Sequence, residues 1–177
     1  MTDLITTRLV LHPLTLAEAA RVVGGVAGPD DVWADGFPGH GDRDAARMAV
    51  NAAKARAEAR LAAVPPVQPD HDPFTCYRID RRMDGTAIGT IGFHGPPDAR
   101  RQVTIGYGLV PMSWGNGYAT EAVHALIDFC RAHADVASLA ADTNHDNAAS
   151  QRVLVKSGFR LVRQDRELLY YELELDG

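Results

Sequence analysis

The sequence predicts an α+β fold, because hairpin-like strand pairs and amphipathic helices occur along one chain of 177 residues. Residues 74–80 and 87–93 are strand-like segments on either side of Asp84 and Gly85, a pair that favours a tight hairpin turn. Residues 103–110 are a further strand-like segment, and a glycine-rich turn and an amphipathic helix follow it directly. Together these patterns predict a sheet that carries helices.

The amino-terminal part is predicted to contain one strand and a short helix. Residues 8–12 have the pattern of a strand. Thr15, with Glu18 three residues later, forms a capping box that starts the helix. The helix is expected to end at about residue 23, because Gly24 and Gly25 follow.

A second, alanine-rich helix is predicted to start at Asp42, which we expect to cap it, and to end near residue 63. Pro65 and Pro66 would end this helix, and residues 67–73 are expected to be irregular. The remaining predicted elements are loops at 28–41 and 94–101, a strand at 138–142, a helix at 148–157 followed by Gly158, and a final hairpin of 159–162 and 168–174.

The most informative segment is the turn after the 103–110 strand, which consists of Trp114, Gly115, Asn116, Gly117, Tyr118 and Ala119. A strand, a glycine turn and a helix start together present free backbone N–H groups to an anion. Glycine also lets a phosphate approach without a Cβ in the way. The turn is neither a Walker A loop nor a GxGxxG fingerprint. It predicts a cradle for a diphosphate, and a plain tight turn is the alternative.

Four stretches carry a family resemblance: Thr7 to Leu14, Ile105 to Pro111, Trp114 to Ala122, and Asn147-x-x-Ser150-x-x-Val153-Leu154-x-Lys156-x-Gly158-Phe159. Taken together they resemble the Gcn5-related N-acetyltransferase (GNAT) superfamily. The resemblance is greatest to its branch of ribosomal-protein N-terminal acetyltransferases and small-amine acetyltransferases. Each stretch alone is a weak indication, whereas the combination is specific.

This resemblance implies a single-domain, three-layer αβα fold over residues 1–177, with a mixed, mostly antiparallel sheet and a splayed central strand pair. It also implies an enzyme that transfers an acetyl group from acetyl-coenzyme A, its co-substrate, to a primary amine of a small molecule or peptide by direct attack. Two alternatives stay open. One is a different acyl or aminoacyl donor. The other is a noncatalytic acyl-CoA-binding module, because Thr104 and Trp114 depart from common family patterns.

The resemblance further implies where the coenzyme lies. Pantetheine would occupy the gap between the strand before the glycine turn and the strand at 138–142, and backbone N–H groups of the turn would bind the diphosphate. Trp114 would either stack on the adenine or cover the domain surface, as large aromatic side chains often do. The implied coenzyme-binding residues are Leu109, Val110, Trp114, Gly115, Asn116, Gly117, Tyr118, Ala119, Asn147 and Ser150.

Ser150 and His94 are the candidate catalytic residues. In the branch that this chain resembles, the serine of Asn-x-x-Ser lies near the thiol and can protonate it. At Ser150 and Asn147 the alternative is an ordinary capped helix start. Thr104 stands where related enzymes often carry a glutamate, so His94, after the 87–93 strand, is the leading general base. His145 is second, and proton loss to water is a third alternative.

The loop before the alanine-rich helix is expected to shape the acceptor site. Trp33 and Phe37 would form walls of a pocket, and Asp35 or Asp42 would receive the ammonium group of the amine. For the aromatic pair the alternative is simple coverage of the core. For Asp42 it is the capping role given above.

Composition agrees with a cytoplasmic protein. The net charge of −5, from 18 Lys and Arg against 23 Asp and Glu, disfavours nucleic-acid and anionic-membrane partners, and it suits either a cationic substrate or simple solubility. Cys76 and Cys130 lie in apolar patterns and are expected to be reduced core residues. No metal is expected, because the seven histidines form no ligand motif. A monomer or a homodimer is expected.

Overall fold

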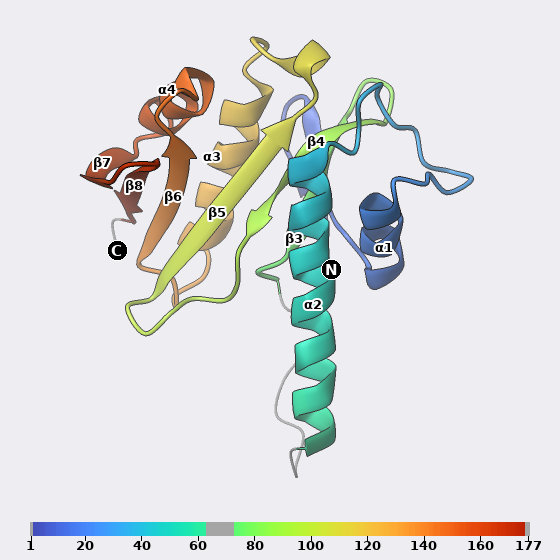
Figure 1. Cartoon of the computed structure of the whole chain (residues 1–177), viewed down its shortest axis with the longest axis horizontal. Coiled ribbons are helices and arrows are strands. Elements are labelled where there is room, and N and C mark those ends of the chain that lie inside the picture. Colours follow the sequence, from blue (N-terminus) through green and yellow to red (C-terminus); the bar gives the residue numbers. More distant parts are fainter. Residues whose placement is uncertain (1, 63–72, 176–177) are drawn as a thin grey trace.

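A single eight-stranded mixed sheet organises the computed structural model, which describes residues 2–62 and 73–175 (Figure 1). The strand order is β1-β2-β3-β4-β5-β6-β8-β7, and every neighbouring pair is antiparallel except β5 and β6. The strands are β1 Leu4–Ile5, β2 Leu9–Pro13, β3 Cys76–Arg81, β4 Thr86–Phe93, β5 Gln102–Leu109, β6 Ser138–Asn144, β7 Arg160–Gln164 and β8 Leu168–Glu174.

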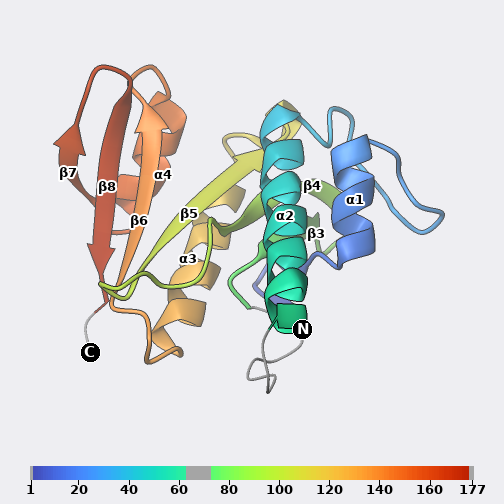
Figure 2. The same ribbon diagram turned by 60° about the horizontal axis from the view of Figure 1, so that its bottom comes forward.

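Helices cover both faces of this sheet. They are α1 Leu16–Gly24, α2 His40–Ala62, α3 Tyr118–Arg131 and α4 Ala148–Lys156, with a short 3₁₀ helix, η1, at Pro111–Ser113. Figures 1 and 2 show α1 and α2 on one side of the sheet, and α3 and α4 on the other. The expected α+β class and three-layer arrangement are therefore confirmed.

The parallel pair β5–β6 is joined at one end only. Its register is limited to Gln102↔Ser138, Val103↔Leu139 and Thr104↔Ala140, and the two strands diverge after that point (Figures 1 and 2). The expected splayed pair is thus confirmed.

On its other side β5 remains paired with β4. His94 N–H donates to Thr104 C=O at 2.9 Å, and Val110 N–H donates to Ile88 C=O at 2.8 Å. Because backbone groups of alternate residues in a strand point to opposite sides, Ile105, Tyr107 and Leu109 direct theirs toward β6. In this stretch β6 is too far away to pair with them. The divergence therefore leaves a short run of strand backbone available to another molecule.

Short-range signals place α1 as expected. The Thr15 side chain accepts from Glu18 N–H, the Glu18 side chain accepts from Thr15 N–H at 2.8 Å, and the helix ends at Gly25 with a positive φ of 68°. Apolar side chains at helical spacing likewise pack one face of α3 against the core. They are Ala122, Val123, Leu126, Ile127 and Cys130.

The start of α2 differs from the expectation. The helix begins at His40, so Asp42 lies inside its first turn and does not occupy the capping position. Asp42 Oδ2 accepts from Gly39 N–H at 2.9 Å, and Oδ1 accepts from Thr90 Oγ1 at 2.7 Å on β4. The sequence alone did not reveal the long-range hydrogen bond to Thr90, which holds the Asp42 side chain against the sheet.

The other predicted elements occur within a few residues of their expected bounds. The sequence pattern missed β1 and η1, which are too short to show a periodicity. The expected end of α2 near residue 63, the break at Pro65 and Pro66, and most of the irregular segment at 67–73 lie outside the described residues.

Gly92 is a position where the sheet has no room for a side chain. A Cβ there would lie 2.6 Å from Thr75 O and 2.7 Å from Cys76 Cα, both backbone atoms. We expect Gly92→Ala to lower the free energy of unfolding by about 1–3 kcal/mol in denaturant titrations. Gly24→Ala is the control, because nothing lies within 4 Å of its Cβ, and it should be neutral or slightly stabilising. Equal stabilities for the two variants would contradict this close approach.

Candidate functional site

The glycine turn after β5 forms an open cradle of backbone donors. Gly115 and Gly117 have positive φ values of 75° and 78°, and Gly117 caps α3. Within the described residues, the N–H groups from Gly115 to Ala119 have no hydrogen-bond partner. A Cβ on Gly115 would meet nothing within 4 Å. The turn therefore fits an anion such as the diphosphate of coenzyme A.

Arg8 and Glu121 hold this turn against β2. Arg8 Nη1 donates to Asn116 C=O at 2.9 Å, and Arg8 Nε donates to Glu121 Oε2 at 2.7 Å. Thr6 Oγ1 donates to Glu121 Oε1 at 2.6 Å. Burial acts to raise the pKa of Glu121, but the hydrogen bonds from Thr6 and Arg8 and the Arg8 charge hold that pKa below its usual value. The sequence analysis missed this pair, because its members lie on separate elements.

Trp114 and Val110 both make hydrogen bonds within the chain. The Trp114 side chain is 63% exposed, and its Nε1–H donates to Leu109 C=O at 2.7 Å, so the indole joins the turn to the end of β5. Val110 N–H donates to Ile88 C=O, and Val110 C=O accepts from Ser113 N–H at 2.9 Å. Both backbone groups of Val110 therefore have partners, and the Leu109 N–H on the β6 side is the better candidate for a pantetheine contact.

Ser150 lies in the first turn of α4, facing the divergence of β5 and β6. Its backbone N–H donates to Asn147 Oδ1 at 3.1 Å, so Asn147 caps α4 as expected. Its Oγ lies 2.9 Å from Tyr107 Oη on β5. Tyr107 is a functional candidate that sequence reasoning missed, because only the folded chain brings β5 and α4 together.

A cavity of about 180 Å³ lies on the α2 face of the sheet. The start of α2 forms one wall, and strands β4 and β5 form the floor. Its lining residues are Gly41, Asp44, Ala45, Met48, Cys76, Thr90, Gly92, Phe93, His94, Gly106, Tyr107 and Gly108. The Nε2 atom of His94 lies only 2.8 Å from where a Cβ on Gly106 would be, so its imidazole lies directly over β5. The structure therefore brings His94 to this cavity.

The residues of the loop before α2 that were expected at the acceptor site do not line this cavity. Phe37 is buried, and Trp33 packs edge-to-face on it with ring centroids 5.3 Å apart. Asp35 is exposed, and none of these three residues lines the cavity. Asp42 is buried behind Thr90, and burial raises its pKa although hydrogen bonds from Thr90 and Gly39 oppose this. His145 Nε2 lies 2.8 Å from Asp165 C=O, away from the cavity lining.

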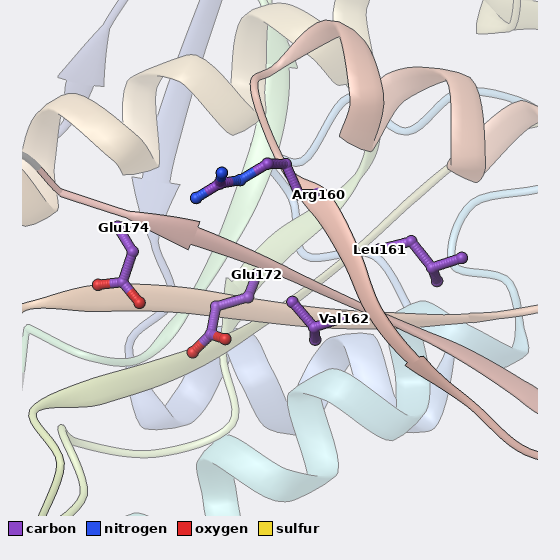
Figure 3. A pocket seen from close by; sticks show the side chains of 5 residues that line it. All are labelled: Arg160, Leu161, Val162, Glu172 and Glu174. Atoms are coloured by element: carbon purple, nitrogen blue, oxygen red, sulfur yellow. The ribbon is translucent and has the colours of Figure 1, made fainter.

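A second cavity, of about 250 Å³, lies on the outermost strands β7 and β8 (Figure 3). It is lined by Arg160, Leu161, Val162, Glu172 and Glu174. Figures 1 and 2 place these strands at one edge of the sheet, away from α2. This cavity contains neither His94 nor the glycine turn, so we assign no chemistry to it.

The described residues contain neither a metal-binding cluster nor a membrane-spanning helix. Across residues 2–62 and 73–175, no three His, Cys, Asp or Glu side chains are grouped so that they could hold a metal ion. In the part of the chain that the structure describes, no helix combines the length and apolar character needed to cross a membrane.

The chain is similar to known proteins in sequence and in fold. The acetyltransferase (GNAT) domain matches residues 8–160. The uncharacterized N-acetyltransferase YoaA of Bacillus subtilis (strain 168) is 35% identical over 94 residues, which are 53% of this chain and 53% of that protein. An acetyltransferase structure from Agrobacterium tumefaciens str. C58 has a TM-score of 0.62 at 25% identity, covering 98% of this chain and 94% of that chain.

RimL, a ribosomal L7/L12 α-N-protein acetyltransferase solved in complex with coenzyme A, has a TM-score of 0.66 over 99% of both chains. At 14% identity this likeness shows the fold alone. The domain match covers most of the chain, and the chain therefore belongs to the GNAT acetyltransferase family. It spans about half the length of the curated relatives that it matches.

Both cysteines are predicted to be unreactive in the folded protein. Burial raises the pKa of Cys76 and of Cys130 to about 12, with smaller contributions from the charges of Asp42 and Asp135. Because the thiolate is the reactive form, Ellman's reagent at pH 8 should label neither thiol within minutes. In denaturant it should label both. Rapid labelling of the native protein, assigned with Cys76→Ser and Cys130→Ser variants, would contradict this burial.

Proposed function

We propose that this protein transfers an acetyl group from acetyl-coenzyme A to a primary amine of a small molecule or peptide. One observation carries the proposal: β5 has the glycine turn and Ser150 on its α3–α4 side, and the His94 cavity on its α2 side. A thioester held in the divergence of β5 and β6 would be exposed to an amine in that cavity. This arrangement suits direct transfer between two bound substrates.

Residues around the divergence would hold the coenzyme. The N–H groups from Gly115 to Ala119 would bind the diphosphate, and the unpaired edge of β5 at Leu109 would bind a pantetheine amide. Ser150 would lie beside the sulfur. When bound, the coenzyme supplies an activated acyl group, and the chain supplies position and hydrogen bonds.

Direct attack is favoured over an acyl-enzyme intermediate. Such an intermediate needs an activated nucleophile at the site. Cys76 is the thiol that lines the cavity, and with a pKa of about 12 it remains protonated near neutral pH. The amine itself is therefore the better nucleophile.

His94 is the group best placed to take the proton of the amine. It lines the cavity at the end of β4, and its backbone N–H donates to Thr104 C=O. Asp44 also lines the cavity; its carboxylate is paired with Arg47 but 68% exposed, so it can still contact an incoming ammonium group. His94 would then remove a proton to give the neutral amine that attacks.

The acceptor is either a small primary amine or a peptide amine. The RimL structure carries the name of an enzyme that acetylates a protein α-amino group, and this chain shares its fold. The cavity opens beside the exposed start of α2, where Asp44 is 68% exposed, which leaves room for either class. Thr104 in place of a carboxylate is the feature that favours the second candidate, a noncatalytic acyl-CoA-binding module.

Turnover separates these candidates. Thiol release from acetyl-coenzyme A should rise above background with at least one member of a panel of primary amines and amino-terminal peptides. Competition by other acyl-coenzymes would define the donor. Tight coenzyme binding without thiol release across the panel would instead support the noncatalytic module.

The coenzyme cradle predicts a specific sensitivity at Gly117. Gly117→Glu places bulk and negative charge at the cap of α3, so it should weaken coenzyme A binding by 10-fold or more in calorimetry. Gly36→Glu is the matched control, because Gly36 also has a positive φ, 83°, and a Cβ there would meet nothing within 4 Å. If both variants bind coenzyme A as the parent does, the cradle assignment is wrong.

The role of His94 can be tested by removing or displacing the imidazole. His94→Gln should lower kcat/KM by about 100-fold, with coenzyme affinity unchanged. Gly106→Ala should act in the same direction by pushing the ring away. Gly108→Ala adds the same methyl group at 3.9 Å from Asp42 Oδ1 and should have a smaller effect. A kcat/KM of His94→Gln within about threefold of the parent, with coenzyme bound normally, would contradict this assignment.

A further inference from the structure

Tyr107 lies where the two functional faces of β5 meet. Its backbone borders the α2-face cavity between Gly106 and Gly108, whereas its side chain points to the opposite face of the sheet, where its Oη lies 2.9 Å from Ser150 Oγ and 3.2 Å from Ser150 C=O. Tyr107 is half-buried on a strand, and Ser150 is held at a helix start by Asn147. The phenol is thus the nearest polar side-chain partner of the Ser150 hydroxyl among the described residues.

We propose that Tyr107 is a positioning residue: its phenol donates to Ser150 Oγ and so leaves the Ser150 hydroxyl proton free to be donated to the sulfur of the coenzyme. The inference rests on the proposed function, because it requires the thioester sulfur to lie beside Ser150. It adds a residue that neither the glycine turn nor the Asn-x-x-Ser stretch includes.

The direction of the hydrogen bond determines which of the two hydroxyl groups keeps a free proton. Each hydroxyl has one proton to donate and can also accept. If Ser150 donated to Tyr107, its proton would point away from the divergence. If Tyr107 donates, Ser150 keeps its proton for the sulfur. The Ser150 C=O can also accept from the phenol, at 3.2 Å, but the contact with Ser150 Oγ is shorter.

Tyr107 is also suited to remain a donor. Burial raises the pKa of Tyr107 to about 12, although the hydrogen bond with Ser150 opposes the rise. The phenol therefore keeps its proton throughout the pH range in which an amine substrate is partly neutral. A serine hydroxyl whose oxygen accepts a hydrogen bond is in turn a stronger donor, because hydrogen bonds in a chain polarise one another.

In the transfer step, the amine nitrogen forms a bond to the acyl carbon and the carbon–sulfur bond breaks. The electron pair of that bond stays on sulfur. Nitrogen loses two protons in all: His94 takes the first from the ammonium group and releases it to solvent, and then takes the second as the amide forms. Ser150 donates a hydrogen bond to the charge that develops on sulfur, and Tyr107 holds Ser150 in the orientation for doing so. No proton leaves Tyr107.

The direct readout is the pKa of the enzyme-bound coenzyme A thiol, measured by the ultraviolet absorbance of its thiolate. The thiols of Cys76 and Cys130 do not interfere, because their pKa values are about 12. Ser150→Ala should raise the pKa of the bound thiol by about 1. Tyr107→Phe, which keeps the ring, should raise it by a similar amount, and the double variant should show no further rise.

Turnover provides the second readout. Tyr107→Phe and Ser150→Ala should each lower kcat by about 10-fold at unchanged KM for acetyl-coenzyme A, and the double variant should lose no more than the larger single loss. Tyr170→Phe is the matched control. It also loses a tyrosine hydrogen bond, from Oη to Asp165 Oδ2 at 2.8 Å, but on β8. It should match the parent in both measurements.

The outcomes are distinguishable. If Ser150→Ala changes kcat and the thiol pKa while Tyr107→Phe behaves as Tyr170→Phe does, the Tyr107 proposal is overturned and the proposed function stands. Losses that multiply in the double variant would also overturn it, because the two residues would then act independently. A parent protein that neither binds coenzyme A nor releases thiol would overturn both. Tyr107→Met is a second variant should Tyr107→Phe fail to fold.

Discussion

The divergence of β5 and β6 is the constraint on which the rest of this structure depends. Parallel strands normally continue their pairing, because an unpaired backbone group buried away from water is destabilising. Here pairing stops after Thr104 and Ala140, and the backbone of the following β5 residues faces a gap. The protein covers part of that edge with its own side chains: the Trp114 indole donates to Leu109 C=O, and the Tyr107 phenol reaches Ser150.

Each face of β5 is specialised because of this gap. On the α3–α4 side, the turn after β5 ends in Gly117, and its N–H groups are directed outward. Hydrogen bonds from Arg8 to Asn116 C=O and to Glu121 hold the turn in place. On the α2 side, Gly106 and Gly108 leave the strand without side chains, so that His94 and an acceptor can approach the backbone. A thioester in the gap would therefore contact both faces at one strand. We regard the position of β5, which borders both the coenzyme gap and the acceptor cavity, as the basis of the proposed direct transfer.

Local signals in the sequence predicted local structure well. The capping box of Thr15 and Glu18 and the apolar face of α3 depend on residues three or four positions apart, and both were confirmed. The glycine turn and the Asn147 cap were predictable for the same reason. The family resemblance added the splayed strand pair, which no local pattern of apolar residues indicates.

Contacts between distant residues could not be predicted in this way. Tyr107 and Ser150 are 43 positions apart, and Asp42 and Thr90 are 48 apart. Asp42 was therefore expected to be a cap although it is a buried partner of β4. For Trp33 and Phe37 a pocket wall and coverage of the core were both open, and the fold packs the two rings on each other outside the lining of the cavity. His94 was expected at the cleft because it ends a strand, and it does line the cavity.

A crystal structure of the protein with coenzyme A bound would test the central claim most directly. We predict that pantetheine lies between β5 and β6, with an amide on the Leu109 backbone, the diphosphate on the N–H groups of Gly115 to Ala119, and the sulfur beside the Ser150 hydroxyl. Coenzyme bound at another surface, with β6 closed against β5 along its length, would contradict the account.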